Sequence, residues 1–142
     1  MGFNRLLIHS ILFFCLLPPW PASMADEPAG DMKKRIQVGI DSNGSKIELR
    51  PGDEIEIELQ GAGGTGYAWY FDKLDSDFFE LIHEGRKTQE KSRQIVGSPI
   101  LYTWVFKAKK MGESVIKMSY YRVWEGKDTA VRRFGVEINI IP

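Results

Sequence analysis

Side chains that commonly carry catalysis or bind metals are scarce in this chain. Its 142 residues include one cysteine, Cys15, and two histidines, His9 and His83. A Ser–His–acid arrangement would have to use His83, because His9 lies in an apolar N-terminal run, and no nucleophile-elbow motif is present. If the N-terminal run that contains His9 and Cys15 is removed, one histidine and no cysteine remain, which also argues against zinc. We therefore expect no enzyme activity, no catalytic residue, no metal and no cofactor. His83 is interpreted as a surface residue, with a His83-dependent hydrolase as an alternative.

The chain also lacks net charge and any sustained helical periodicity. Its 19 basic and 19 acidic side chains balance, so nothing predicts a nucleic-acid surface. Apolar residues make up 43% and charged residues 27%, which is typical of a folded globular protein. The glycine-rich stretch at residues 61–66 is not followed by the lysine and serine or threonine of a phosphate-binding loop. These absences exclude the usual nucleic-acid and nucleotide-binding signatures.

The N-terminus has the features of a targeting segment. Residues 6–17 (LLIHSILFFCLL) form an apolar run that is too short to span a bilayer comfortably and that is followed by Pro18. Ser23 and Ala25 place small residues where a signal peptidase reads them. We predict a secretory signal peptide over residues 1–25, a flexible leader over 26–34 and one domain over 35–142.

Cys15 does not suit a lipoprotein signal, because Phe14 directly before it is large. After cleavage behind Ala25 the chain has no cysteine, and export without disulfides suits a bacterial periplasm. We therefore predict a periplasmic or secreted protein, a monomer, that contacts no membrane once the signal is removed.

Several short segments alternate apolar and polar residues, which is typical of half-buried strands. In the clearest of them, EIEIEL at residues 54–59, the three glutamates are expected to form a solvated face. A charged stretch at residues 84–93 is interpreted as a solvated loop or an edge hairpin, and Trp69 and Trp104 as core residues. An all-β sandwich or barrel of seven to eight strands follows. The expected strands lie near residues 36–40, 47–49, 54–59, 67–71, 78–84, 101–107, 115–121 and 134–140.

Three segments together resemble the chagasin-type inhibitors of papain-like cysteine peptidases. The first, Gly64-Thr65-Gly66-Tyr67-Ala68-Trp69, is similar to the family's N-P-T-T-G loop, which is followed by an aromatic, a small residue and tryptophan. The second, Val96-Gly97-Ser98-Pro99, precedes a strand that ends in Phe106-Lys107-Ala108, as in the family's second loop. The third, Tyr120 to Glu125 (YYRVWE), matches a tyrosine-bearing strand and an R-P-W loop. The resemblance covers about Ile36 to Ile141.

The resemblance implies an immunoglobulin-like β-sandwich whose three loops lie side by side and enter the peptidase cleft as a wedge. It implies a reversible, non-covalent inhibitor in which Thr65 and Gly66 lie over the target's catalytic cysteine and histidine. Gly97 and Ser98 would run beside the unprimed subsites, and Arg122 and Trp124 would pack on the primed side. The implied peptidase-binding residues are Gly63, Gly64, Thr65, Gly66, Tyr67, Gly97, Ser98, Pro99, Arg122, Val123, Trp124 and Glu125.

The sequence departs from the family pattern at the loop tips. Ala62, Gly63 and Gly64 stand where the family has Asn, Pro and Thr, and Val123 replaces a proline. We expect the glycines to leave the first loop loose, so that Gly63→Pro would tighten binding by lowering the entropy lost on ordering. The alternative function is a binding module of the same fold that recognises another envelope protein without inhibiting a peptidase.

Overall fold

The computed structural model describes residues 33–88 and 96–142, so the predicted signal peptide and most of the leader lie outside the described residues. The described part is built from strands and two short 3₁₀ helices, η1 and η3, and none of its helices could span a membrane. The strands are β1 (Arg35–Val38), β2 (Lys46–Leu49), β3 (Glu54–Ala62), β4 (Tyr67–Lys73), β5 (Phe79–Thr88), β6 (Pro99–Ala108), β7 (Gly112–Arg122) and β8 (Arg132–Ile140).

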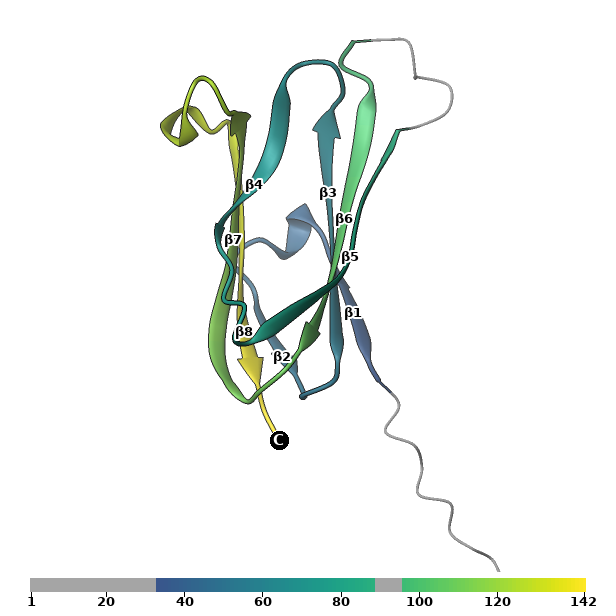
Figure 1. Cartoon of the computed structure of the whole chain (residues 1–142), viewed down its shortest axis with the longest axis vertical. Coiled ribbons are helices and arrows are strands. Elements are labelled where there is room, and N and C mark those ends of the chain that lie inside the picture. The colour runs from purple at the N-terminus through teal and green to yellow at the C-terminus, as the bar shows by residue number, and fades with distance from the viewer. Residues whose placement is uncertain (1–32, 89–95) are drawn as a thin grey trace, which may run out of the picture. The chain divides into compact units, whose positions relative to one another are not determined.

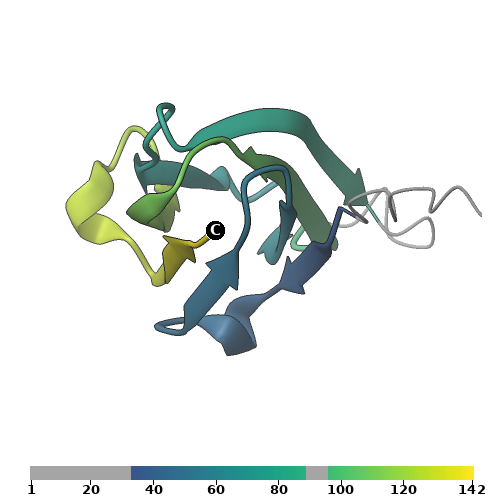
Figure 2. The same cartoon turned by 90° about the horizontal axis from the view of Figure 1, so that it is seen from below.

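The strands form two four-stranded sheets that face each other across a common core (Figures 1 and 2). One sheet has the order β1-β3-β6-β5 and the other β2-β8-β7-β4. The short strands β1 and β2 pair in parallel with β3 and β8, and the other neighbours are antiparallel. The expected all-β, immunoglobulin-like sandwich is confirmed, with eight strands.

Alternation along β3 shows why the sequence folds this way. Ile55, Ile57 and Leu59 are fully buried between the sheets, and burial of side chains of this size contributes about 1.5–3 kcal/mol each. The glutamates between them face outward, where Arg35 on β1 forms ion pairs with Glu54 and Glu56. Trp69 and Trp104 lie in the core, as predicted from their strand positions.

Several strands begin or end two to four residues away from the predicted boundaries, and two of these differences have a clear structural reason. The first strand ends at Val38, and Ile40 begins the 3₁₀ helix η1 (Ile40–Ser42) with a half-exposed side chain, because the chain turns there towards the other sheet. The fifth strand does not end near Glu84. It continues to Thr88 as the edge of its sheet, and the Glu84 carboxylate accepts a hydrogen bond from the buried Trp104 indole at 3.1 Å. Residues 89–95 of the charged stretch lie outside the described residues.

The connections bring three loops to one end of the sandwich, opposite the C-terminus (Figure 1). The β3–β4 connection crosses from one sheet to the other, whereas the β5–β6 and β7–β8 connections each join neighbours within one sheet. The crossing loop is therefore placed between the other two. We call residues 63–66 loop 1, 96–98 loop 2 and 123–131 loop 3.

Candidate functional site

Loop 1 is a tight turn built on glycine. Gly64 and Gly66 have φ values of 73° and 80°, a region that side chains with a Cβ rarely adopt. Between them, the Thr65 hydroxyl donates to the Ala62 carbonyl at 2.6 Å and accepts from the Tyr67 N–H at 3.4 Å. The threonine side chain thus closes the turn, and the exposed part of loop 1 is glycine backbone.

Loop 1 is joined to loop 2 through backbone groups. The Gly63 N–H donates to the Ser98 carbonyl, and the Gly97 N–H donates to the Gly63 carbonyl, both at 2.7 Å. The Ile100 side chain packs closely against Gly63. A Cβ added to Gly63 would lie only 3.0 Å from Ile100 Cδ1. The expected loose loop is therefore wrong at Gly63, because the β5–β6 hairpin supplies partners for both of its backbone groups.

Loop 1 is joined to loop 3 through Arg122, the last residue of β7. Its Nε donates to the Thr65 carbonyl at 2.9 Å, and its Nη1 pairs with the Glu125 carboxylate, also at 2.9 Å. The guanidinium lies over the Tyr67 ring, 4.5 Å from the ring centroid. The hydrogen bond and charge of Glu125 raise the pKa of Arg122 above its ordinary value, so the cation persists at any working pH.

Trp124 of loop 3 rests on Gly66. A Cβ on Gly66 would lie 2.1 Å from Cη2 of Trp124, which no side chain could occupy without moving the indole. The indole is nevertheless 69% exposed, and its neighbour Val123 is also exposed. Across loop 1, Val96 of loop 2 is 76% exposed and packs 3.7 Å from the Cβ position of Gly64. Apolar side chains thus flank the glycine backbone on both sides.

Buried aromatic residues support loop 1 from below. The Tyr120 hydroxyl accepts a hydrogen bond from the Ala62 N–H at 2.7 Å, and its ring stacks on Tyr67 with centroids 5.4 Å apart. The Trp69 indole donates to the Gln60 carbonyl at 3.1 Å. These bonds hold the end of β3, and therefore the start of loop 1, on the core.

The structure brings the twelve predicted site residues to one end of the sandwich, with different exposures. Ser98 is buried, and Tyr67 and Arg122 are half-buried and face their neighbours. Pro99 is the first residue of β6, paired with Ala62. The exposed members are Gly64, Gly66, Gly97, Pro99, Val123, Trp124 and Glu125.

Two residues at this end were not predicted. Val96 could have been found, because an apolar residue beside a glycine in a loop is a typical contact residue. The role of Tyr120 could not have been found from the sequence, because its hydroxyl bonds Ala62 on a strand of the other sheet. His83 is exposed, as expected, but lies mid-strand in β5 at an irregularity in its pairing with β6.

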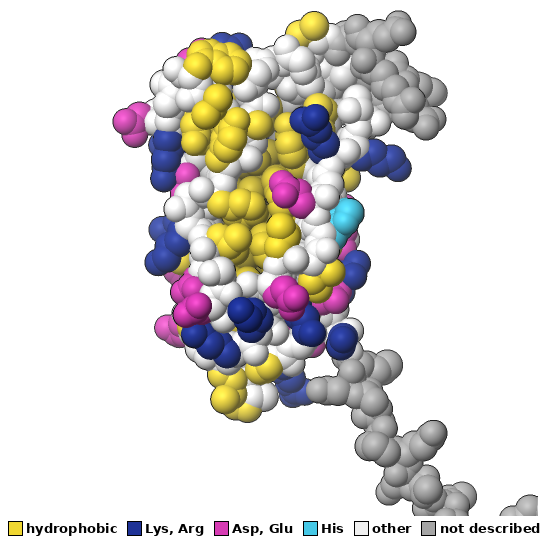
Figure 3. Space-filling model, in the orientation of Figure 1, with side chains coloured by type: hydrophobic (Ala, Val, Ile, Leu, Met, Phe, Trp, Pro, Cys, Tyr) yellow, Lys and Arg dark blue, Asp and Glu magenta, His cyan; other side chains and the backbone are white. Residues whose placement is uncertain are grey.

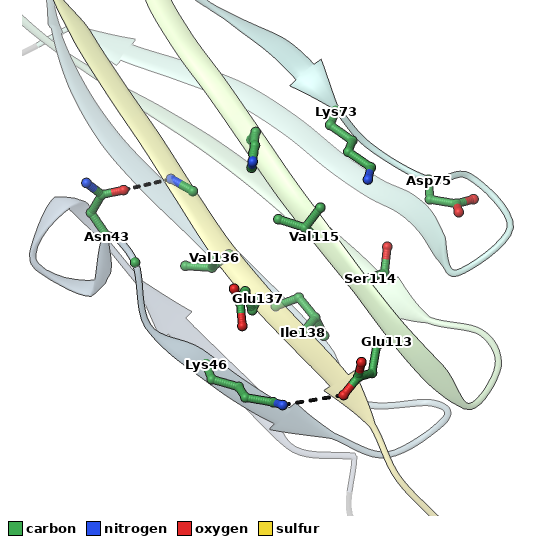
Figure 4. Close-up of a pocket in the computed structure, with 13 residues that line it drawn as sticks. Asn43, Lys46, Lys73, Asp75, Glu113, Ser114, Val115, Val136, Glu137 and Ile138 are labelled. Atoms are coloured by element: carbon green, nitrogen blue, oxygen red, sulfur yellow. Dashed lines mark hydrogen bonds and ion pairs between the residues drawn. The ribbon is translucent and has the colours of Figure 1, made fainter.

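The loop end lies at one end of the sandwich and carries apolar side chains (Figure 3). A hollow of the described residues lies elsewhere, on the outer face of the β2-β8-β7-β4 sheet (Figure 4). That hollow mixes lysines with carboxylates, as in the pair of Lys46 and Glu113 at 3.4 Å. The described residues contain no group of three or more His, Cys, Asp or Glu side chains that could hold a metal ion. The geometry suits insertion into a partner's cleft.

Comparisons with known proteins agree with this geometry. Amoebiasin-2 of Entamoeba histolytica is 35% identical over 77 residues, which span 54% of this chain and 62% of that relative. Chagasin of Trypanosoma cruzi is 25% identical over 96 residues, covering 66% of this chain and 87% of chagasin. The crystal structure of the cysteine protease inhibitor EhICP2 from Entamoeba histolytica superposes with a TM-score of 0.70 at 25% identity, covering 79% of this chain and all of that one.

These relatives are inhibitors rather than enzymes, which agrees with the prediction that this chain is not an enzyme. A family profile, described as Chagasin family peptidase inhibitor I42, matches residues 48–138, which include all three loops. The chain therefore belongs to the chagasin family of peptidase inhibitors.

Proposed function

We propose that this protein is an exported, reversible, non-covalent inhibitor of papain-like cysteine peptidases that inserts its three loops into the active-site cleft. Family membership and the likeness to a cysteine protease inhibitor support the class of target. The apolar N-terminal run with small residues before Asp26 supports export.

The observation that carries this proposal is the construction of loop 1. Its tip is exposed glycine backbone, tied to loop 2 through Gly63 and to loop 3 through Thr65. Glycine lets a backbone approach another surface closely and leaves no side chain for a peptidase to grip. Because the loop is already ordered, little conformational entropy is lost when it binds. We call the surface formed by loops 1, 2 and 3 the ridge. Its ordered, glycine-tipped shape would fit into a narrow cleft.

The three loops would divide the cleft between them. Thr65 and Gly66 would lie over the catalytic cysteine and histidine, with Gly97 offering backbone to the unprimed side. Trp124 would supply the primed-side anchor, since exposed tryptophan is enriched among residues that dominate binding energy. Arg122 would act mainly by holding loop 1, because its guanidinium is engaged within the molecule.

Titration of active papain with the purified protein tests the proposal. We expect stoichiometric loss of peptidase activity that is recovered on dilution, and Trp124→Ala should weaken inhibition by about 2 kcal/mol without lowering Tm. The control is Met111→Ala, which removes a similarly exposed apolar side chain from the β6–β7 turn at the opposite end. Binding without inhibition would favour the binding-module alternative, and no interaction with any papain-like peptidase would refute the proposal.

Export is tested separately by mass spectrometry of the protein recovered from outside the cytoplasm. The expected first residue is Asp26. An intact Met1, or a lipid on Cys15, would contradict the predicted signal cleavage.

A further inference from the structure

Loop 3 has a second attachment, on the outer face of the β2-β8-β7-β4 sheet. Asp72, near the end of β4, accepts a hydrogen bond from the Ser119 hydroxyl of β7 through one carboxylate oxygen. Its other oxygen pairs with the Lys127 ammonium at 2.9 Å. Lys127 begins η3 (Lys127–Thr129), the short helix inside loop 3. Three elements therefore meet at one carboxylate.

The burial of these groups makes the arrangement specific. Ser119 is fully buried, and only 14% of the Asp72 side chain is exposed. Partial burial alone would raise the pKa of Asp72, but the Ser119 hydrogen bond and the Lys127 pair outweigh it and hold that pKa below the ordinary value. Asp72 is thus charged at neutral and mildly acid pH, and a shielded carboxylate requires the partners that it has here.

The other polar contacts of loop 3 in the described part of the chain lie at its base or within it. Glu125 pairs with Arg122 through its carboxylate at 2.9 Å and donates its N–H to the Arg122 carbonyl at 3.0 Å, and the Val131 N–H donates to the Tyr120 carbonyl. The remaining hydrogen bonds join residues 126–130 to one another. Gly126 separates Trp124 from η3 and has a φ of 85°, which residues with a Cβ rarely adopt. The contact between Lys127 and Asp72 fixes the η3 side of Gly126 on the sheet.

We propose that Asp72, Ser119 and Lys127 form a clamp that positions loop 3 with Trp124 over Gly66, and that the clamp sets the affinity for the peptidase. This inference rests on the proposed function. The three are positioning residues: they act through Trp124 rather than by touching the target. The opposing explanation is that Lys127, half-exposed beside the loops, itself contacts the peptidase.

A mutant cycle with papain separates these explanations. We expect Lys127→Ala and Asp72→Asn each to weaken inhibition about three- to tenfold. In a Trp124→Ala background the same changes should have less than about a twofold effect, because coupled residues are not additive. The control is Lys110→Ala, which removes an equally exposed lysine from a pair with Asp77 at 3.4 Å at the opposite end. If Lys127 contacts the target directly, Asp72→Asn will not weaken inhibition, and Lys127→Ala will have its full effect without Trp124. Either result overturns the clamp.

Hydrogen exchange of the free protein gives a readout that does not depend on inhibition. Asp72→Asn should speed exchange of the backbone amides at residues 124–130, and Lys127→Arg should preserve their protection. Unchanged exchange in Asp72→Asn would overturn the clamp even if the wild-type protein inhibits papain. Conversely, a protein that fails to inhibit but shows the expected exchange would refute the proposed function and leave the clamp as a device that orders loop 3.

Discussion

Loop 1 is held in two different ways on its two sides. Towards loop 2, the ties are backbone hydrogen bonds between Gly63 and residues 97 and 98. Towards loop 3, they are side-chain contacts, with Arg122 bonded to the Thr65 carbonyl and Trp124 lying on Gly66. Backbone ties survive most substitutions, whereas each side-chain tie depends on one residue.

The difference indicates which substitutions would leave the position of loop 1 unchanged. Replacement of side chains in loop 2 leaves the Gly63 bonds in place, so that side provides a constant frame. Replacement in loop 3 alters both the exposed surface and the position of loop 1. We therefore expect loop 3 to contribute more to affinity, and loop 2 to contribute more to the shape of the ridge.

Gly66→Ala should have the largest effect on inhibition, because it disrupts the contact between loop 1 and Trp124 of loop 3. The added Cβ would be strained at a φ of 80° and would displace the Trp124 indole from the position that it occupies. Together these effects predict a loss of about 3 kcal/mol of binding free energy, roughly a hundredfold in Ki. Measured papain inhibition and Tm would check this.

Gly44→Ala is the matched control, since Gly44 has a φ of 79° but nothing within 4 Å of its Cβ position. It should cost about 1 kcal/mol of folding stability from backbone strain alone and leave Ki unchanged. Equal effects of the two variants on Ki would show that the contact between Trp124 and Gly66 has no role in binding.

Gly63→Pro breaks the loop 2 side. Proline removes the N–H that donates to the Ser98 carbonyl and introduces atoms against Ile100. We expect inhibition weakened by about 2 kcal/mol, the opposite sign to that expected from the family pattern. Gly63→Ala keeps the N–H and requires only the end of the Ile100 side chain to move, so it should weaken inhibition less than Gly63→Pro. Tighter inhibition by Gly63→Pro would mean that the bound loop abandons this hydrogen bond.

Arg122→Lys should have the smallest effect on inhibition among these variants, and it tests the side-chain contacts between loop 1 and loop 3. Lysine keeps the charge but loses the fork that bonds the Thr65 carbonyl and the Glu125 carboxylate at once. We predict about 1 kcal/mol weaker inhibition, with a Tm close to that of the wild type. A loss as large as that of Gly66→Ala would show that Arg122 also contacts the peptidase.

Most of the fold could be predicted from the sequence because alternation along β3 and β8 records which face is buried. The prediction failed where exposed side chains do not mark the end of a strand. Glu84 is charged and exposed, yet it lies in an edge strand and bonds a core tryptophan, so β5 runs further than the pattern indicates. Ile40 reads as a strand residue, but it stands in a 3₁₀ turn.

The candidate site was located by three short segments that resemble the family's loops, and each of these segments is local in the sequence. The hydrogen bonds and ion pairs that hold the loops in place were not predicted, because they join residues far apart in the chain. The bond from Gly63 to Ser98 requires that a loop crossing the sheets meets a hairpin tip, and Lys127 meets Asp72 only after β4 and β7 pair. These contacts between distant residues determine how rigid the loops are. The prediction of a loose loop failed at Gly63 because it did not include them.

The most direct test of the account is a hydrogen-exchange footprint of the protein with and without papain. If the ridge enters the cleft, the complex should slow exchange of amides at Gly64, Thr65 and Gly66 and at residues 123–125. The turn at Asn43 and Gly44, beside the hollow on the sheet face, should exchange as in the free protein. Protection confined to that sheet face, with unchanged exchange in loops 1 and 3, would contradict the account.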